Sequence, residues 1–331
     1  MKLEILVPQY TETYDVIKPL LDSLEIQRGI DLKDIGVIMV NDGSDVIIDN
    51  IILDSYSYPI QYIKNEHLGV SATRNECLKH STADYVMFCD ADDCFYGVDS
   101  IYTIFECINN QNDRPDVING TFLEELKIDN EVKYLLRNED NIFVHGKIYR
   151  RSYLIDNEIR FNPNLTVHED SYFTKLARVY SEKIVTIAKP IYVWCWRSDS
   201  VCRKDPLYIL KTYGDLIDSS TALVEKLCEL KKATEAITLT TATIYDAYFQ
   251  FNKEEWNKPE NSKYRLLAEK KIASYYSKFL PLHNLIDEEV KRGIIIGIRN
   301  RMYGEGLMME MITFDDWIKH IEDLAHEEKL L

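Results

Sequence analysis

The chain has little of several features that mark common classes of protein. Its seven cysteines are scattered along 331 residues, with no Cys-x-x-Cys pair and no Cys/His spacing typical of zinc sites. No window approaches the roughly 18 consecutive apolar residues of a membrane span. The apolar run before Pro8 is too short for a signal peptide and contains Glu4. With a net charge of −16, broad binding to nucleic acid or anionic membrane is disfavoured. We therefore expect a reduced, soluble protein of the cytoplasm.

Apolar sequence is plentiful, at 46% of all residues, and it predicts strands that alternate with helices. Short apolar runs predict strands at 3–7, 37–40, 60–64, 85–89 and 116–119. We expect Pro8 to end the first of them, because proline cannot donate to a central ladder. Helical spacing predicts helices at 14–27, 68–79 and 98–109. This alternation predicts a mostly parallel, doubly wound α/β sheet, in which ligands bind beyond the carboxyl ends of the strands.

The pattern changes after the fifth predicted strand. Residues 121–137 alternate in shorter steps, as in an antiparallel excursion, whereas residues 170–180 have helical spacing. A strand is predicted at 184–196, interrupted by Pro190. Past roughly Pro206 the sequence is helical throughout, with turn signals at 257–259, at Pro281 and at 304–306. We therefore predict one domain at 1–205 and a helical domain at 206–331.

An acidic turn, Asp90-Ala91-Asp92-Asp93, follows the fourth predicted strand directly. Three carboxylates at the end of a buried strand repel one another and are costly to desolvate, so a positive group should lie beside them. Oxygen ligands of this kind suit Mg²⁺ or Mn²⁺, which commonly bridge carboxylates to substrate phosphates. The alternative is a solvated acidic turn, which is the more common meaning of an isolated D-x-D. The strand before it favours the metal site.

Three more polar positions are candidates for chemistry. Asp42 follows the second strand and can accept a hydrogen bond from a base, although Asp-Gly is usually only a turn. Arg74 lies in the helix that opens at Gly69, where it can meet a phosphate; the alternative is a surface arginine. Asp170 lies near the start of a predicted helix. It can be a helix cap or a general base that takes a hydroxyl proton.

Six segments share an order and spacing that is not generic, over about residues 1 to 200: Ile5-Leu-Val-Pro-Gln-Tyr10, Val40-Asn-Asp-Gly-Ser44, Gly69-Val-Ser-Ala-Thr-Arg-Asn75, Phe88-Cys-Asp-Ala-Asp-Asp93, Lys147-Ile-Tyr-Arg-Arg151 and His168-Glu-Asp-Ser-Tyr-Phe173. In these segments the chain resembles the family 2 inverting glycosyltransferases of the GT-A fold. The resemblance implies metal-dependent transfer of a hexosyl or N-acetylhexosaminyl group from a nucleotide donor, with a UDP-sugar favoured. One carboxylate base, with no nucleophile placed against the sugar, suits direct displacement with inversion.

The resemblance also implies roles for single residues. The donor would be bound by residues from several segments: Pro8, Tyr10, Asp42, Arg74, Asp90, Ala91, Lys147 and Arg197. Asp90 and Asp92 would be the D-x-D pair that holds Mn²⁺ or Mg²⁺, with Asp92 the more direct ligand. Asp170 would activate the acceptor hydroxyl, with Glu169 beside it.

The chain departs from the family at Thr11, where members often carry an asparagine after the first Pro-x-Tyr. Beyond the base lies the segment Trp194-Cys-Trp-Arg197-Ser-Asp-Ser200. It is our candidate for the aromatic–arginine segment that family members often carry over the donor. Asp199 or His168 would complete the metal shell. The alternative for Trp194 and Trp196 is core packing at alternate strand positions.

The helical region after residue 205 matches no motif. Aromatic stripes at 240–251 and 266–279 are more typical of helix–helix cores than of binding surfaces. Family members often use appended helices for acceptor choice or oligomerisation, so the resemblance implies one of these roles and a possible homo-oligomer. The acceptor is left open as a glycan, a polymer or another hydroxyl compound.

Two other functions compete with the glycosyltransferase. A nucleotidyl-transfer enzyme would need a glycine-rich, basic phosphate loop near the N-terminus, which residues 9–13 do not supply. A non-catalytic module that only binds a nucleotide-sugar or glycan is the second alternative. Intact Asp90, Asp92 and Asp170 favour the enzyme.

Overall fold

The computed structural model describes residues 2–111, 113–129, 131–198, 200, 203, 205, 207–303, 307 and 311–328. The chain divides into two compact units, Met1–Ser200 and Val201–Leu331. Our predicted boundary falls between residues 205 and 206, and Pro206 lies outside the described residues. Each unit is considered by itself below.

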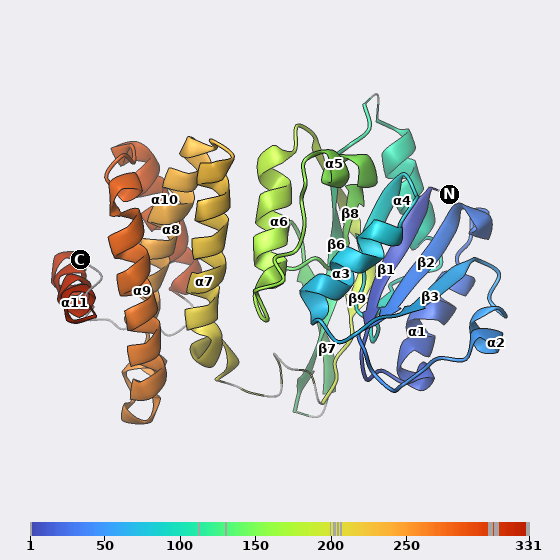
Figure 1. The fold of residues 1–331 in the computed structure, drawn as a ribbon, viewed down its shortest axis with the longest axis horizontal. Helices are drawn as coiled ribbons and strands as arrows, with labels where there is room; N and C mark the ends of the chain where they lie inside the picture. Colours follow the sequence, from blue (N-terminus) through green and yellow to red (C-terminus); the bar gives the residue numbers. More distant parts are fainter. Residues whose placement is uncertain are drawn as a thin grey trace. The chain divides into compact units, whose positions relative to one another are not determined.

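The first unit is built on one mixed sheet (Figure 1). Its described strands are β1 (Leu3–Gln9), β2 (Ile35–Asn41), β3 (Ile60–Lys64), β4 (Tyr85–Phe88), β5 (Cys94–Phe95), β6 (Val117–Ile128), β7 (Glu131–Arg137), β8 (Lys147–Arg150) and β9 (Ile184–Trp194). Their order is β3-β2-β1-β4-β8-β6-β9-β5, and β7 pairs with β6. Strands β1 to β4, β6 and β9 run in one direction, whereas β5, β7 and β8 run against them. The predicted mostly parallel α/β class is therefore confirmed.

Helices cover the sheet because strands buried on both faces need an apolar layer on each side. Those of this unit are α1 (Tyr14–Glu25), α2 (Asn50–Leu53), α3 (Val70–His80), α4 (Ser100–Asn109), α5 (Arg151–Asp156) and α6 (Glu169–Tyr180). Four apolar residues of α1 and three of α4 join Leu3, Ile5 and Val7 of β1 in one buried core cluster. This packing fits the sequences of these strands, because β4 is wholly apolar, β2 is nearly so, and β1 is apolar except for Glu4 and Gln9.

Proline has different effects in the two strands where it occurs. The prediction that Pro8 ends the first strand is wrong, because β1 continues to Gln9 and Pro8 pairs with Val40 of β2. The ladder between β1 and β4 stops at Leu6, so no second neighbour requires an amide hydrogen from Pro8. In β9, Pro190 lies where the pairing with β6 shifts register. The predicted interruption of that strand is wrong, because β9 continues through Pro190 and only its register with β6 shifts there.

The second unit is helical, as predicted. Its described helices are α7 (Tyr208–Glu229), α8 (Ala233–Phe251), α9 (Ser262–His283), α10 (Glu288–Met302) and α11 (Phe314–Glu327). The aromatic stripes of α8 and α9 are core, because Tyr248, Phe251, Tyr275 and Phe279 are buried. The turn predicted at 304–306 lies outside the described residues. In the described part of the chain, the helices are too short or too polar to cross a membrane.

Candidate active site

Three parallel strands bring the first predicted site residues to one edge of the sheet. Strands β1, β2 and β4 are neighbours, and their carboxyl ends lead into Tyr10, Asp42 and Asp90 respectively. Ligands bind at this edge in open α/β sheets, because the loops that leave the strands there diverge and form a crevice.

Asp42 organises the loop that leads into α3. Its carboxylate accepts hydrogen bonds from the backbone N–H groups of Leu68 and Gly69, and it lies 2.9 Å from His67 Nδ1. Gly43 has a φ of +74°, and a Cβ there would lie 2.3 Å from the His67 nitrogen, so the close approach of the two loops requires glycine. The ring of Tyr10 stacks on His67 with centroids 4.8 Å apart and remains half-exposed. An aromatic face is thus available beside Asp42, and Pro8 precedes it on β1.

Arg74 connects three carboxylates that are distant in sequence. Its Nη1 donates to Glu169 at 2.8 Å and to Asp170 at 2.7 Å, and its Nη2 donates to Asp90 at 2.9 Å. The guanidinium also lies over the ring of Phe161. Only 3% of Arg74 is exposed, so the alternative of a surface arginine is wrong. The motif of α3, the acidic turn and the start of α6 therefore form one electrostatic cluster.

Asp170 is held in a defined position within this cluster. In addition to its bond from Arg74, its Oδ2 accepts the N–H of Val144 at 3.3 Å. Burial raises the pKa of Asp170 to about 6, although Arg74 acts in the opposite direction. A carboxylate with a pKa near 6 is a stronger base than an ordinary carboxylate. It is nevertheless mostly deprotonated at neutral pH, so it can accept a proton there. This geometry is compatible with the predicted general base.

The acidic turn is more than a solvated loop. Ala91 and Asp93 are buried, and Asp93 accepts hydrogen bonds from the Tyr192 hydroxyl and from the backbone N–H of Cys195. Asp92 is about a third exposed and lies 3.2 Å from Arg197 Nη1. Burial and the neighbouring charge of Asp90 raise the pKa of Asp92 to about 6. For Asp90, burial is outweighed by Arg74, so the pKa of Asp90 is lowered.

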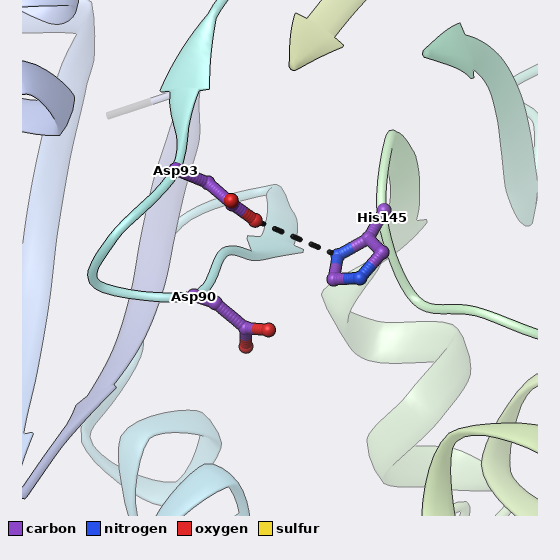
Figure 2. Close-up of side chains that lie close together, drawn as sticks. All are labelled: Asp90, Asp93 and His145. Atoms are coloured by element: carbon purple, nitrogen blue, oxygen red, sulfur yellow. Dashed lines mark ion pairs between the residues drawn. The ribbon is translucent and has the colours of Figure 1, made fainter. Parts of the chain in front are cut away.

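A histidine that the sequence analysis did not assign completes this region. His145 Nδ1 lies 3.9 Å from Asp93 Oδ2, and Figure 2 shows its ring facing Asp93 and Asp90. Ligand atoms of these three side chains lie within 4.8 Å of one another, which fits a divalent cation with oxygen and nitrogen ligands. The sequence offers only a weak signal for it, because nothing in the spacing between residues 93 and 145 predicts that they meet.

Two other predicted donor residues lie in different surroundings. Lys147 is buried, and its Nζ donates to Asp140 and to the carbonyl of Phe143. Burial lowers the pKa of Lys147, against the effect of Asp140. Its contact with a diphosphate or acceptor stays a prediction, as does that of Arg197.

Trp194 and Trp196, on either side of Cys195, lie in different surroundings. The Trp194 ring packs against Phe143 and His145, with centroids 4.9 Å and 5.0 Å apart, so core packing is observed there. Trp196 donates its backbone N–H to Glu125. His168 is the N-cap of α6 in a left-handed conformation, and Asp199 lies outside the described residues. Their place in a metal shell stays a prediction.

Comparison with known proteins supports the motif analysis. Residues 4–106 match the family described as Glycosyl transferase family 2. The chain is 24% identical over 257 residues to the glycosyltransferase GlyA of Streptococcus pneumoniae serotype 4. The matched stretch covers 69% of this chain and 35% of that protein. It is 24% identical over 324 residues to the poly(ribitol-phosphate) beta-glucosyltransferase of Bacillus spizizenii, which covers 91% of this chain and 48% of that protein. The chain thus spans less than half the length of both relatives.

Solved structures show the same fold. Residues 1–349 of S. aureus TarS in complex with UDP superpose with a TM-score of 0.60 at 19% identity, covering 95% of this chain and 94% of that chain. The complex of the same TarS segment with UDP-GlcNAc gives a TM-score of 0.61. The family match, the glycosyltransferase relatives and the shared fold agree with the six motif segments. Residues 4–106 therefore match the family 2 glycosyltransferases, and the chain shares the GT-A fold of the TarS structures.

Proposed function

We propose that this chain is a metal-dependent, inverting glycosyltransferase that moves a sugar from a UDP-sugar to an acceptor hydroxyl. The observation that carries this proposal is the Arg74 cluster. One buried guanidinium bonds both to Asp90, on the predicted donor side, and to Asp170, the predicted base. A direct displacement needs these two sides at a fixed separation, because the acceptor oxygen attacks the anomeric carbon opposite the leaving group.

Asp170 would take the acceptor's proton. As the acceptor oxygen bonds to the anomeric carbon, its hydrogen passes to the Asp170 carboxylate and the bond to the nucleotide diphosphate breaks with its electron pair. One displacement inverts the anomeric configuration. Burial supports the role, since it raises the pKa of Asp170 to about 6 and brings it nearer to that of a neutral-pH base.

The donor would lie along the edge from Tyr10 to Asp92. Pro8, Tyr10 and Asp42 would line the nucleoside pocket, and the half-exposed Tyr10–His67 stack supports this by offering an aromatic face. When bound through Asp90 and Asp92, Mn²⁺ or Mg²⁺ would offset the negative charge of the departing diphosphate. The raised pKa of Asp92 fits such a group, because burial and the charge of Asp90 outweigh the effect of Arg197, and a bound cation would offset both. UDP in the TarS complex supports the choice of nucleotide.

The acceptor is proposed to be a hydroxyl-bearing glycan or polymer. Support comes from the printed name of the Bacillus spizizenii relative, a glucosyltransferase of poly(ribitol phosphate). The helical region, 206–331 in our division, would bind this acceptor or join subunits of a homo-oligomer. A catalytically silent module that retains the fold is the alternative.

Asp170→Asn tests the base directly. We expect donor binding to persist and sugar transfer to fall by about 10²–10⁴-fold, because the amide cannot accept the proton. Binding is measured as stabilisation by UDP-sugars, and transfer as UDP release with an acceptor mixture. Glu169→Gln is the matched control, since it also removes a carboxylate bonded to Arg74 but leaves Asp170 in place.

Two outcomes would decide against the proposal. Near-normal transfer by Asp170→Asn would show that another group is the base. If the unaltered chain binds a UDP-sugar but neither hydrolyses nor transfers it with any acceptor, the non-catalytic alternative holds.

A further inference from the structure

Two cysteine side chains meet at the edge of the sheet where the predicted donor residues lie. The Sγ atoms of Cys94 and Cys195 are 3.7 Å apart, within the range of a sulfur hydrogen bond. Cys94 begins β5 directly after the acidic turn, whereas Cys195 directly follows β9. Both residues are partly exposed, in contrast to the buried Cys77 and Cys89. Since partly exposed thiols react and buried ones are inert, this pair is open to chemistry.

Short stretches of chain connect both thiols to the acidic turn. Cys94 is the next residue after Asp93, and the backbone N–H of Cys195 donates to the Asp93 carboxylate at 2.8 Å. Two residues beyond Cys195, Arg197 Nη1 lies 3.2 Å from Asp92. The segment after β9 is thus attached to the acidic turn by a backbone hydrogen bond and by an ion pair. A change at the two sulfurs reaches both contacts through at most two residues of chain.

The strand pairing determines what a covalent bond between the sulfurs would do. In the antiparallel ladder of β5 and β9, Cys94 is opposite Val193, so Cys195 is diagonal to Cys94. Diagonal residues of such a ladder have Cα atoms about 7–8 Å apart, whereas a disulfide normally needs less than about 7 Å. Closing the bond therefore requires backbone movement. Cys195 is the residue that can move, because it lies beyond the end of β9, and Arg197 would move with it.

We propose that Cys94 and Cys195 form a reversible modification site, at which a disulfide closes and draws Arg197 away from the donor. The modification site does not depend on the proposed function, but its effect on the donor rests on that function. Disulfides that form transiently are redox sensors in reducing compartments, so the expectation of a reduced protein is compatible with this site.

The oxidant is a small disulfide such as oxidised glutathione. One protein thiol attacks a sulfur of the small disulfide, and a mixed disulfide forms as the first small thiol leaves. The second protein thiol then attacks the mixed disulfide, and the second small thiol leaves. One S–S bond is formed and one is broken, and the two protons of the protein thiols end on the two small thiols. The protein is oxidised by two electrons, which reduce the small disulfide.

The experiment equilibrates the full chain with mixtures of reduced and oxidised glutathione and maps cross-links by mass spectrometry of tryptic peptides. In unaltered protein we expect a link between the peptides of Cys94 and Cys195 with loss of the two thiol hydrogens, reversed by dithiothreitol. UDP-sugar affinity is measured in the same samples. We expect oxidation to weaken it about tenfold, the factor that corresponds to the loss of one hydrogen bond to a charged group.

Cys94→Ser removes one thiol of the pair and keeps a small polar side chain. We expect it to bind UDP-sugars as the reduced, unaltered protein does, and to lose both the cross-link and the response to oxidation. Cys228→Ser is the matched control, because it removes an exposed thiol of the second unit and leaves the pair intact. It should retain the cross-link and the full response. Thermal unfolding shows whether each variant folds, and the link in unaltered protein decides on the modification site even if Cys94→Ser does not.

Opposite results would overturn the inference. Absence of the Cys94–Cys195 link in the most oxidising mixture excludes the modification site, whether or not the chain transfers a sugar. A link that forms without any change in UDP-sugar affinity removes the effect on the donor and leaves the proposed transferase intact. If neither redox form binds a UDP-sugar, the proposed function fails and the effect on the donor fails with it, while the mapped link separately supports or excludes the modification site.

Discussion

The two aspartates of Asp90-Ala-Asp92 each face an arginine, but the two arginines lie in different environments. Arg74 comes from α3, its side chain is 4% exposed, and it bonds to three carboxylates. Arg197 follows β9, its side chain is 28% exposed, and it lies 3.2 Å from Asp92. The two aspartate side chains are exposed to a similar extent, 32% and 30%, so the difference between the two pairs lies in the arginines.

This difference indicates different tasks for the two ion pairs. A buried arginine with several carboxylates is costly to disrupt, because a charge left without its partner stays desolvated. A partly exposed pair exchanges its partner for water at little cost. We infer that Arg74 fixes the position of Asp90 and Asp170 in the fold, whereas Asp92 and Arg197 remain available to a ligand.

Of the substitutions that test this difference, Arg74→Met should have the largest effect, and the effect should be on stability. It leaves Asp90, Glu169 and Asp170 without their common cation, and we expect a loss of about 3–5 kcal/mol in the free energy of unfolding, typical of a broken buried ion pair. Urea denaturation measures it. Arg74→Lys is the matched control, because it keeps the charge but loses the planar fork that reaches several carboxylates. Unchanged stability in Arg74→Met would contradict the assigned role.

The pH dependence of transfer should show the next largest effect. Asp170 must be deprotonated to act as a base, and its pKa is raised to about 6. We therefore expect the rate to fall by about tenfold for each pH unit below about 6, and to level off above it. Arg74→Met, if it folds, should move this limb to higher pH, because the cation that lowers the pKa of Asp170 is absent.

Asp92 needs a control in that measurement, because its pKa is also raised to about 6. Asp92→Asn cannot titrate at this position. A limb that persists in Asp92→Asn arises from Asp170, whereas a limb that disappears would assign the titration to Asp92.

The parts of the chain before and after Asp90 also differ in how much of their structure could be predicted from the sequence. Local patterns were sufficient to locate β1 to β4, and the buried strands β2 and β4 lead into recognisable polar turns, Asn41-Asp42 and Asp90-Ala91. The family resemblance then named Arg74 and Asp170 as site residues. It did not predict that the two bond directly, because that contact depends on how α6 returns to α3.

Predictions failed where tertiary context outweighs local preference. Pro8 continues β1 because its second neighbour ends earlier, which no single-strand pattern reveals. His145 meets Asp93 because β8 lies beside β4, and strand order is not encoded in the residues around the histidine. Trp194 and Trp196 occupy alternate positions of one segment. Their spacing does not reveal that the Trp194 ring packs against Phe143, which comes from a different segment.

Arg197→Ala should have the smallest effect on stability and so completes the comparison. Because both side chains of its pair with Asp92 are about a third exposed, we expect the free energy of unfolding to change by less than about 1 kcal/mol. The same substitution should weaken UDP-sugar binding if Arg197 contacts the diphosphate, as the motif analysis predicts. Unfolding and donor titration of one protein sample measure both quantities. A loss of stability as large as that of Arg74→Met would show that the exposed pair also holds the fold together, and the division between a fixed and an available aspartate would then be wrong.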